Sequence, residues 1–344
     1  MKQTSLKSNF LFNLIYQILA VITPIFTTPY ISRVLSADGI GKYSYALSIV
    51  TYFGIFGCLG TATYGQLEIA RNRDNKKLLH KTVSEIFFGR LVTLMISLLI
   101  YFVVILKASK QYKLLYSVLS LYILGQMNDV SFILQGLEWF KMLAMRNIII
   151  KVLNIVLIFA LVREHNDLYI YAIIIHGITL IGNFSLWPQV IKYIKPKSFK
   201  NMNIIQHWKK SMIYFIPTVA TMVYTVLDKS MIGWITGSEF QNGYYEQAYK
   251  IEQILLVFVT TVGTVTFPRM AYFFENDNKE ERKRIMGITM KFIMLIACPI
   301  CFGTMAISEN LIPVFLGKGY EECILLLRIF SFLNYNYWIR QYDR

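Results

Sequence analysis

Long apolar stretches dominate the chain, and short polar segments separate them. A helix needs about 20 mostly apolar residues to cross the hydrocarbon core of a bilayer. Stretches of this kind predict ten membrane-spanning helices and therefore an all-α polytopic membrane protein. The predicted spans cover residues 10–31, 40–63, 85–106, 112–136, 146–162, 168–190, 211–235, 250–268, 288–307 and 324–339.

The composition supports a bilayer as the solvent. Of the 344 residues, 55% are apolar and only 16% are charged, with a mean hydropathy of +0.47. A single soluble core could not hide that much apolar surface. The composition excludes a disordered chain and a typical cytosolic enzyme, and the four cysteines form no extracellular disulfide pattern.

The basic excess follows the predicted topology. The net charge is +15, and the N-terminus and even-numbered loops hold 20 Lys and Arg against 6 in the odd-numbered loops. This asymmetry places the N-terminus in the cytoplasm, so it indicates membrane orientation and no nucleic-acid partner. All loops are short, which leaves no room for a soluble catalytic domain. We therefore expect a protein that is not an enzyme.

A short internal repeat divides the chain. Gly41–Ile49 and Gly243–Ile251 share Gly, Tyr, Ala and Ile at matching places, and each follows a span that contains proline. Parallel repeats build many transporters, with the substrate path between the halves. We expect two pseudo-repeated lobes around a central cavity: residues 1–195 with six spans and residues 196–344 with about four. A second half of equal length would extend about two spans further, so we expect a C-terminally truncated chain.

Charged residues inside the spans are the strongest candidates for a site. Asp228 and Lys229 lie deep in the span 211–235, Asp129 lies in the fourth span, and Lys250 begins the eighth. A buried charge costs a few kcal/mol or more, so such residues usually face a bundle interior or a wet cavity. A fixed cation there would attract a phosphate or a carboxylate.

Six motifs in chain order resemble those of Wzx-type O-antigen and capsular-repeat flippases, in the polysaccharide branch of the multidrug/oligosaccharidyl-lipid/polysaccharide exporter superfamily. Two differences are Leu67, where this family usually has Arg, and Phe132, where Trp is common. The family also normally has about twelve spans. The motifs are TPIFTTPYISRVLSADGIG at 23–41, YGQLEIARNRD at 64–74, NDVSFILQGLE at 128–138, YFIP at 214–217 with LDKSMIG at 227–233, GYYE at 243–246 with Lys250 and Ile251, and FPRM at 267–270.

The resemblance implies a MATE-like fold and a substrate. The substrate would be an oligosaccharide on undecaprenyl diphosphate, moved across the bacterial inner membrane from the cytoplasmic to the outer leaflet by alternating access. Candidates for contacting the diphosphate or an acidic sugar are Arg33, Lys229, Lys250 and Arg269. Asp129 and Asp228 are candidates for ion coupling or for holding those cations in place.

Several alternatives remain open from the sequence. No cofactor is expected, and the coupling ion could be a proton or sodium. The resemblance also leaves open cooperation with a polysaccharide polymerase and glycosyltransferases. The competing functions are a multidrug or cation exporter of the same superfamily and a non-functional truncated remnant. A membrane-embedded polymerase or glycosyltransferase is disfavoured, because it would carry a long loop or an extra domain.

Overall fold

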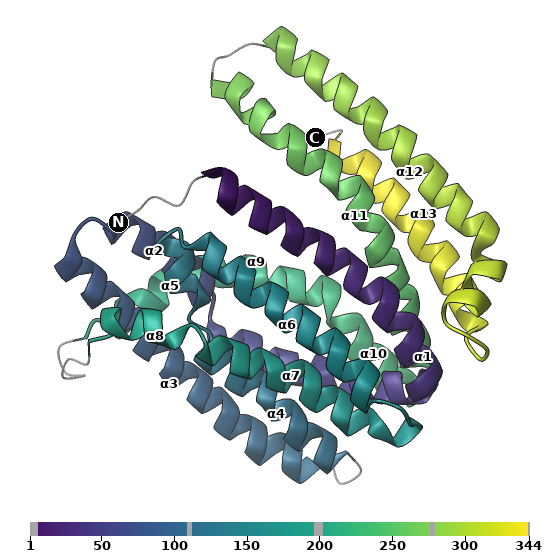
Figure 1. Ribbon diagram of the computed structural model, residues 1–344, viewed down its shortest axis with the longest axis horizontal. Coiled ribbons are helices and arrows are strands. Elements are labelled where there is room, and N and C mark those ends of the chain that lie inside the picture. The colour runs from purple at the N-terminus through teal and green to yellow at the C-terminus, as the bar shows by residue number, and fades with distance from the viewer. Residues whose placement is uncertain (1–5, 109–111, 196–201, 276–278, 343–344) are drawn as a thin grey trace. The chain divides into compact units, whose positions relative to one another are not determined.

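A computed structural model describes residues 6–108, 112–195, 202–275 and 279–342. Within these ranges every regular element is a helix (Figure 1). Two are single 3-10 turns, at His165–Asp167 and Ile191–Tyr193. The α-helices are α1 (Leu6–Cys58), α2 (Thr61–Asn72), α3 (Lys76–Ala108), α4 (Lys113–Asn128), α5 (Ser131–Gly136), α6 (Phe140–Leu161), α7 (Leu168–Phe184), α8 (Trp187–Val190), α9 (Ile204–Thr225), α10 (Leu227–Thr236), α11 (Glu239–Glu275), α12 (Lys279–Phe315) and α13 (Glu322–Tyr342).

The predicted spans overlap these helices in order. Among the described residues, six helices are long and apolar enough to cross a bilayer, and the bent pair α9 and α10 makes a seventh. The first of them, Val21–Asn72, runs from α1 through α2 and overlaps two of the ten predicted spans, 10–31 and 40–63. The predicted spans 250–268 and 324–339 lie in α11 and α13, which are not among the seven.

Three breaks interrupt the apolar helices. Ser36 has φ 57° and ψ 175° and divides α1 into two arms, at the point where the sequence predicts a loop. The predicted fourth span is not continuous, because Asp129 takes an extended conformation between α4 and α5. The seventh span bends by 42° at Val226, between α9 and α10. The prolines Pro24, Pro29 and Pro217 lie inside continuous helical stretches.

The chain folds into two compact units. Unit 1 comprises residues 1–20 and 42–239, and unit 2 comprises residues 21–41 and 240–344. Residues 21–41 of α1, on both sides of the break at Ser36, thus belong to unit 2, although the rest of the N-terminal half builds unit 1. The predicted division into lobes 1–195 and 196–344 describes the repeat and stays a prediction.

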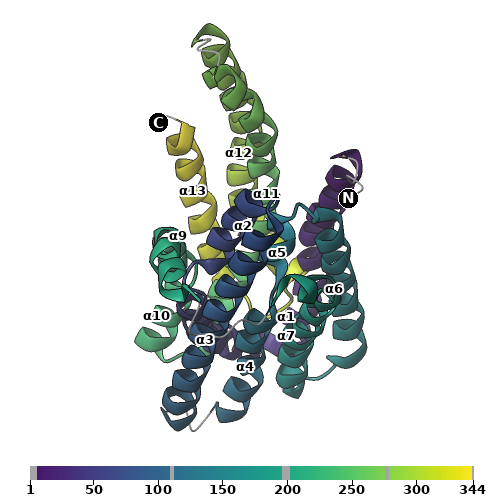
Figure 2. The ribbon, with the colours of Figure 1, turned by 90° about the vertical axis from the view of Figure 1, so that its left-hand side faces the viewer.

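Unit 1 packs around two sets of helices. α7 lies along α4 and α6, and α2 packs on α5, α3 and α9 (Figures 1 and 2). Its core joins α2, α3 and α5 through Ile69, Val83 and Ile133, all fully buried. In unit 2, α12 packs along α13, and Ala248, Leu316 and Leu327 form part of the core.

The outer faces of these helices are apolar. Leu99 on α3, Ile149 on α6 and Ile213 on α9 are 64%, 56% and 69% exposed, and many large apolar side chains share this exposure. Water would not stabilise so extensive an apolar surface, whereas lipid tails do. Together with the long apolar helices, this surface makes the chain a multi-pass membrane protein.

Candidate functional site

The break between α4 and α5 creates a polar centre inside unit 1. Asp129 leaves the helical conformation there, and its Oδ1 accepts a 2.9 Å hydrogen bond from the Ser131 backbone N–H. The Ser131 hydroxyl donates to the same carboxylate oxygen. These local bonds give α5 its start, because they satisfy donors that the first turn of a helix leaves unpaired.

A buried arginine reaches this centre from α3. The Arg90 Nη2 donates to the backbone oxygen and to Oε1 of Gln126, at 3.1 and 3.3 Å, and lies 4.0 Å from Asp129 Oδ2. The guanidinium also lies 5.4 Å from the centroid of the Phe132 ring. Arg90 is only 2% exposed, and its Nε and Nη1 have no hydrogen-bond partner among the described residues.

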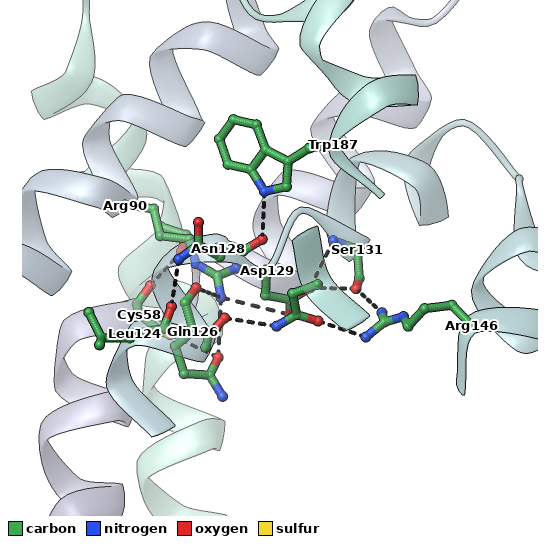
Figure 3. A network of polar contacts seen from close by, with 12 residues as sticks. Cys58, Arg90, Leu124, Gln126, Asn128, Asp129, Ser131, Arg146 and Trp187 are labelled. Carbon is green, nitrogen blue, oxygen red and sulfur yellow. Dashed lines mark hydrogen bonds and ion pairs between the residues drawn. The ribbon is translucent and has the colours of Figure 1, made fainter. Parts of the chain in front are cut away.

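A second arginine enters from α6. Arg146 Nη1 donates to Asn183 Oδ1 at 2.7 Å, and Nη2 donates to the Ser131 hydroxyl at 2.6 Å. The Asn183 amide in turn donates to the Gly125 backbone oxygen on α4. Figure 3 shows the continuous set of contacts, which also includes a 3.2 Å hydrogen bond from the Trp187 indole to the Asn128 backbone oxygen.

The network combines charges from several helices. Two guanidinium groups and one carboxylate share it, so positive charge is in excess among these residues. An unsatisfied buried donor costs about 1–3 kcal/mol. Ionisable groups at membrane depth are usually retained for function. We define this set, Arg90, Gln126, Asp129, Ser131, Arg146 and Asn183, as the buried charge network.

The structure places the other predicted residues of unit 1 outside this network. Asp228 and Lys229 occupy the first turn of α10, directly after the bend at Val226. The next residue, Ser230, anchors this turn to α1, because its hydroxyl lies 2.9 Å from that of Ser48 and 2.6 Å from that of Tyr52. Of the predicted site residues whose side chains the structure describes, only Asp129 belongs to the network.

The predicted cations of unit 2 have partners of their own. The exposed Arg33 donates from Nη2 to the Val314 backbone oxygen at 2.7 Å, near the end of α12, where a cation is favoured by the helix dipole. Lys250 Nζ lies 3.5 Å from Glu246 Oε1 on the same helix. Arg269 lies on α11, but its side chain is outside the described residues.

Sequence reasoning missed Arg90 and Arg146. Arg90 lies within the predicted span 85–106, so the rule that selected Asp228 also applies to it. Arg146 is the first residue of the predicted span 146–162 and therefore counts with the loop cations there, whereas α6 begins at Phe140. The described residues contain no group of three His, Cys, Asp or Glu side chains placed to hold a metal ion.

Long apolar helices with buried charges define the class as a polytopic α-helical membrane protein, and a structural comparison identifies the fold. A solved multidrug resistance MATE family transporter of the MOP superfamily, in an inward-facing conformation, superimposes with a TM-score of 0.63 at 14% identity. The match covers 90% of this chain and 79% of that transporter. The predicted MATE-like fold is therefore confirmed.

Residues 6–274 match the Polysaccharide biosynthesis protein family, and the chain belongs to this family. A Shigella dysenteriae protein named as an O-antigen transporter is 23% identical over 303 residues, covering 87% of this chain and 74% of that protein. An Escherichia coli K12 protein with the same name is 20% identical over 337 residues, covering 95% and 79%.

An archaeal relative matches a shorter part of the chain. A protein of Haloferax volcanii named as a low-salt glycan biosynthesis flippase is 22% identical over 138 residues, covering 40% of this chain and 29% of that protein. The names of these relatives describe transporters and flippases. They support the expectation that the chain is not an enzyme.

Proposed function

We propose that this chain is a flippase that moves a lipid-linked oligosaccharide from the cytoplasmic to the outer leaflet of a bacterial inner membrane. Family membership over residues 6–274, with relatives named for O-antigen transport, is the observation that carries the proposal. The substrate lipid is undecaprenyl diphosphate. Such a substrate joins an apolar tail, which stays in lipid, to a sugar and a diphosphate that hydrocarbon excludes.

The proposed mechanism is alternating access between the lobes 1–195 and 196–344. A path containing cations lowers the cost of desolvating the diphosphate. Among the predicted contacts, Lys229 has the best position for this role, because it begins α10 at a bend in an apolar helix. The contacts of Arg33 and Lys250 with Val314 and Glu246 also support a structural role for these two cations.

The proposed orientation has a cytoplasmic N-terminus. It is supported by the concentration of Lys and Arg in the even-numbered connections, such as the one between α2 and α3. Cysteines placed at exposed Lys77 and exposed Asn166 test it. We expect a membrane-impermeant maleimide to label only N166C in intact spheroplasts and both variants after permeabilisation. Labelling of K77C alone in intact spheroplasts would reverse the orientation.

Complementation tests the proposed function. Residues 1–344 are expressed in a bacterium that lacks its own O-antigen flippase, beside an empty vector and the host flippase. We expect surface polysaccharide to return with this chain. Normal membrane expression without surface polysaccharide, combined with increased drug efflux, would instead support a multidrug or cation exporter. A parallel host with a different repeat unit controls for substrate mismatch.

Lys229 provides a residue-level test in the same cells. We expect Lys229→Ala to reduce surface polysaccharide at least tenfold while expression stays normal, because the variant removes the cation from the bend. The matched control is Lys210→Ala, which removes an exposed cation near the start of α9. If both variants export as wild type does, Lys229 has no role in substrate contact.

A further inference from the structure

All six sulfur-containing residues of α12 lie on one face of that helix (Figure 1). At 3.6 residues per turn, their Cα atoms fall within about 120° of its circumference. Successive members are three or four residues apart, the spacing at which side chains on a helix are neighbours. We define these residues as the sulfur stripe: Met286, Met290, Met294, Cys298, Cys301 and Met305.

The sulfur stripe follows the border between the buried side and the exposed side of α12. Ile293, which flanks it on one side, is 1% exposed, and Phe302, which flanks it on the other, is 55% exposed. The stripe also lies beyond residues 6–274, which match the family. No motif of the proposed flippase therefore accounts for it.

The sulfur atoms at one end of the stripe have the spacing of metal ligands. Cys298 and Cys301 lie about one turn apart on a continuous helix, and Cys301 Sγ lies 4.0 Å from Met305 Sδ. A metal–thiolate bond is about 2.3 Å long, so three sulfur atoms arranged at 120° around one ion lie about 4 Å apart. The observed separation of Cys301 and Met305 therefore fits a trigonal centre with three sulfur ligands.

The ligand set selects the kind of metal ion. Thiolate and thioether sulfur are soft ligands, which favour Cu(I). Structural zinc instead takes four ligands, almost always from Cys, His, Asp and Glu. Among the described residues, no third side chain of these four types joins the two cysteines in a group that could hold a metal ion. Two thiols and one thioether therefore suit Cu(I) better than Zn²⁺.

Two neighbours of the cysteines assist such a centre. Pro299 lies between them and has no N–H, so the helix lacks one backbone hydrogen bond there and the sulfur atoms can adjust their positions. Arg328 on α13 pairs with the exposed Glu309 and also donates from Nε to the Met305 backbone oxygen at 3.2 Å. A guanidinium beside the site favours the negative charge of thiolates.

We propose that Cys298, Cys301 and Met305 form a binding site for Cu(I), and that the other three methionines of the sulfur stripe form its route of entry. Each thiol that coordinates the ion releases its proton, whereas the thioether binds without a change of protonation. Two thiolates and Cu(I) together carry a single negative charge, which the nearby Arg328 offsets. Met286, at the outer end of the route, is 36% exposed, so the stripe connects the site to the surface of α12.

Competition with the chelator bicinchoninate tests the site on purified full-length protein under anaerobic, reducing conditions. The probe is Cu(I) alone, and we expect wild type to withdraw about one ion per chain from the chelator. Cys301→Ser should weaken binding about a hundredfold or more, because even the loss of a residue that only supports a ligand costs 10–100-fold. The matched control is Cys58→Ser, which alters a half-buried thiol of α1 and should bind as wild type does. A wild type that withdraws no Cu(I), or unchanged binding in Cys301→Ser, would overturn the proposal.

A second variant keeps the test valid if Cys301→Ser fails to fold. Met305→Leu conserves volume and removes only the thioether. X-ray absorption should find three sulfur neighbours at about 2.3 Å from copper in wild type and two in this variant. Met95→Leu, at an exposed methionine of α3, is the matched control and should keep three. Two sulfur neighbours in wild type would show that the three-sulfur site is wrong.

The rate of Cu(I) uptake tests the route of entry. Met294→Leu removes the thioether one turn before Cys298. In stopped-flow mixing with Cu(I), we expect this variant to load several-fold more slowly than wild type and Met95→Leu, with an unchanged equilibrium affinity. An unchanged rate, or a loss of affinity as large as that of Met305→Leu, would refute the route. No glycan lipid is present in these measurements, so their outcome does not depend on the proposed flippase function.

Discussion

Gly243→Ala is expected to yield almost no folded protein. Residues 37 and 243 approach so closely in unit 2 that an added Cβ at Gly243 would lie 1.9 Å from the Ala37 backbone oxygen and 2.7 Å from its carbonyl carbon. Both obstacles are backbone atoms, so no side-chain rotation relieves the clash. The segment of α1 that follows the break at Ser36 would have to move away from α11. Such overpacking costs about 1–3 kcal/mol, and more where backbone must move.

Size-exclusion chromatography of detergent-solubilised protein measures this effect, because it reports the yield of monodisperse protein. We expect the yield to fall at least tenfold. The matched control is Gly303→Ala on α12, where nothing lies within 4 Å of the added Cβ. Alanine there removes the entropic cost of glycine in a helix, about 0.5–1 kcal/mol, so the control should be as stable as wild type or slightly more stable. Equal yields for both variants would contradict the close approach.

Arg90→Met is expected to destabilise unit 1 strongly. The variant keeps most of the side-chain length but removes the buried cation beside Asp129 and the guanidinium that donates to Gln126. Removing one partner of a buried ion pair typically costs about 3–5 kcal/mol. The Asp129 side chain is 29% exposed, and its carboxylate lies 4.0 Å from Arg90 Nη2. We therefore expect the free energy of unfolding to fall by about 2–4 kcal/mol, slightly less than for a fully buried pair.

A double-mutant cycle identifies the cause of this loss. Asp129→Asn retains the oxygen that accepts from Ser131 and removes only the charge. We expect Arg90→Met with Asp129→Asn to be more stable than the sum of the single effects, by about 0.5–3 kcal/mol. The control cycle combines Arg73→Met and Glu138→Gln, a more exposed pair at 2.5 Å, and should show a coupling of less than about 1 kcal/mol. Additive effects in the Arg90 cycle would show that the two charges do not act on each other.

The apolar pattern predicts the helices well because length and hydropathy alone decide which segments cross a bilayer. It predicts the break at Ser36, which lies in the expected loop between the first two spans, but not the breaks at Asp129 and Val226 inside predicted spans. The break at Asp129 is stabilised by bonds from Ser131 and by the nearby Arg90 side chain of another helix. The bonds from Ser131 are local, but the contact with Arg90 depends on tertiary structure, which a local pattern does not contain.

The candidate site is predicted only in part for a similar reason. Charge at membrane depth identifies Asp129, and the same criterion is met by Arg90 in the predicted third span. The criterion finds individual residues, but it does not say which of them meet. Asp129 lies 4.0 Å from Arg90 on another helix, and Arg33 reaches a carbonyl 281 residues away in sequence. No spacing in the sequence encodes either partnership.

The placement of residues 21–41 in unit 2 has a consequence for how the protein is made. The Tyr320 hydroxyl donates to the Ser32 backbone oxygen at 2.9 Å, across 288 residues of chain. At about 5–20 residues per second, a ribosome needs roughly 15–60 s to synthesise that interval. During this time Ser32 and Arg33 of α1 are already made, but their partners Tyr320, which precedes α13, and Val314 on α12 are not. The newly inserted segment must therefore wait, in lipid or with an insertion chaperone, at least until Tyr320 has been made.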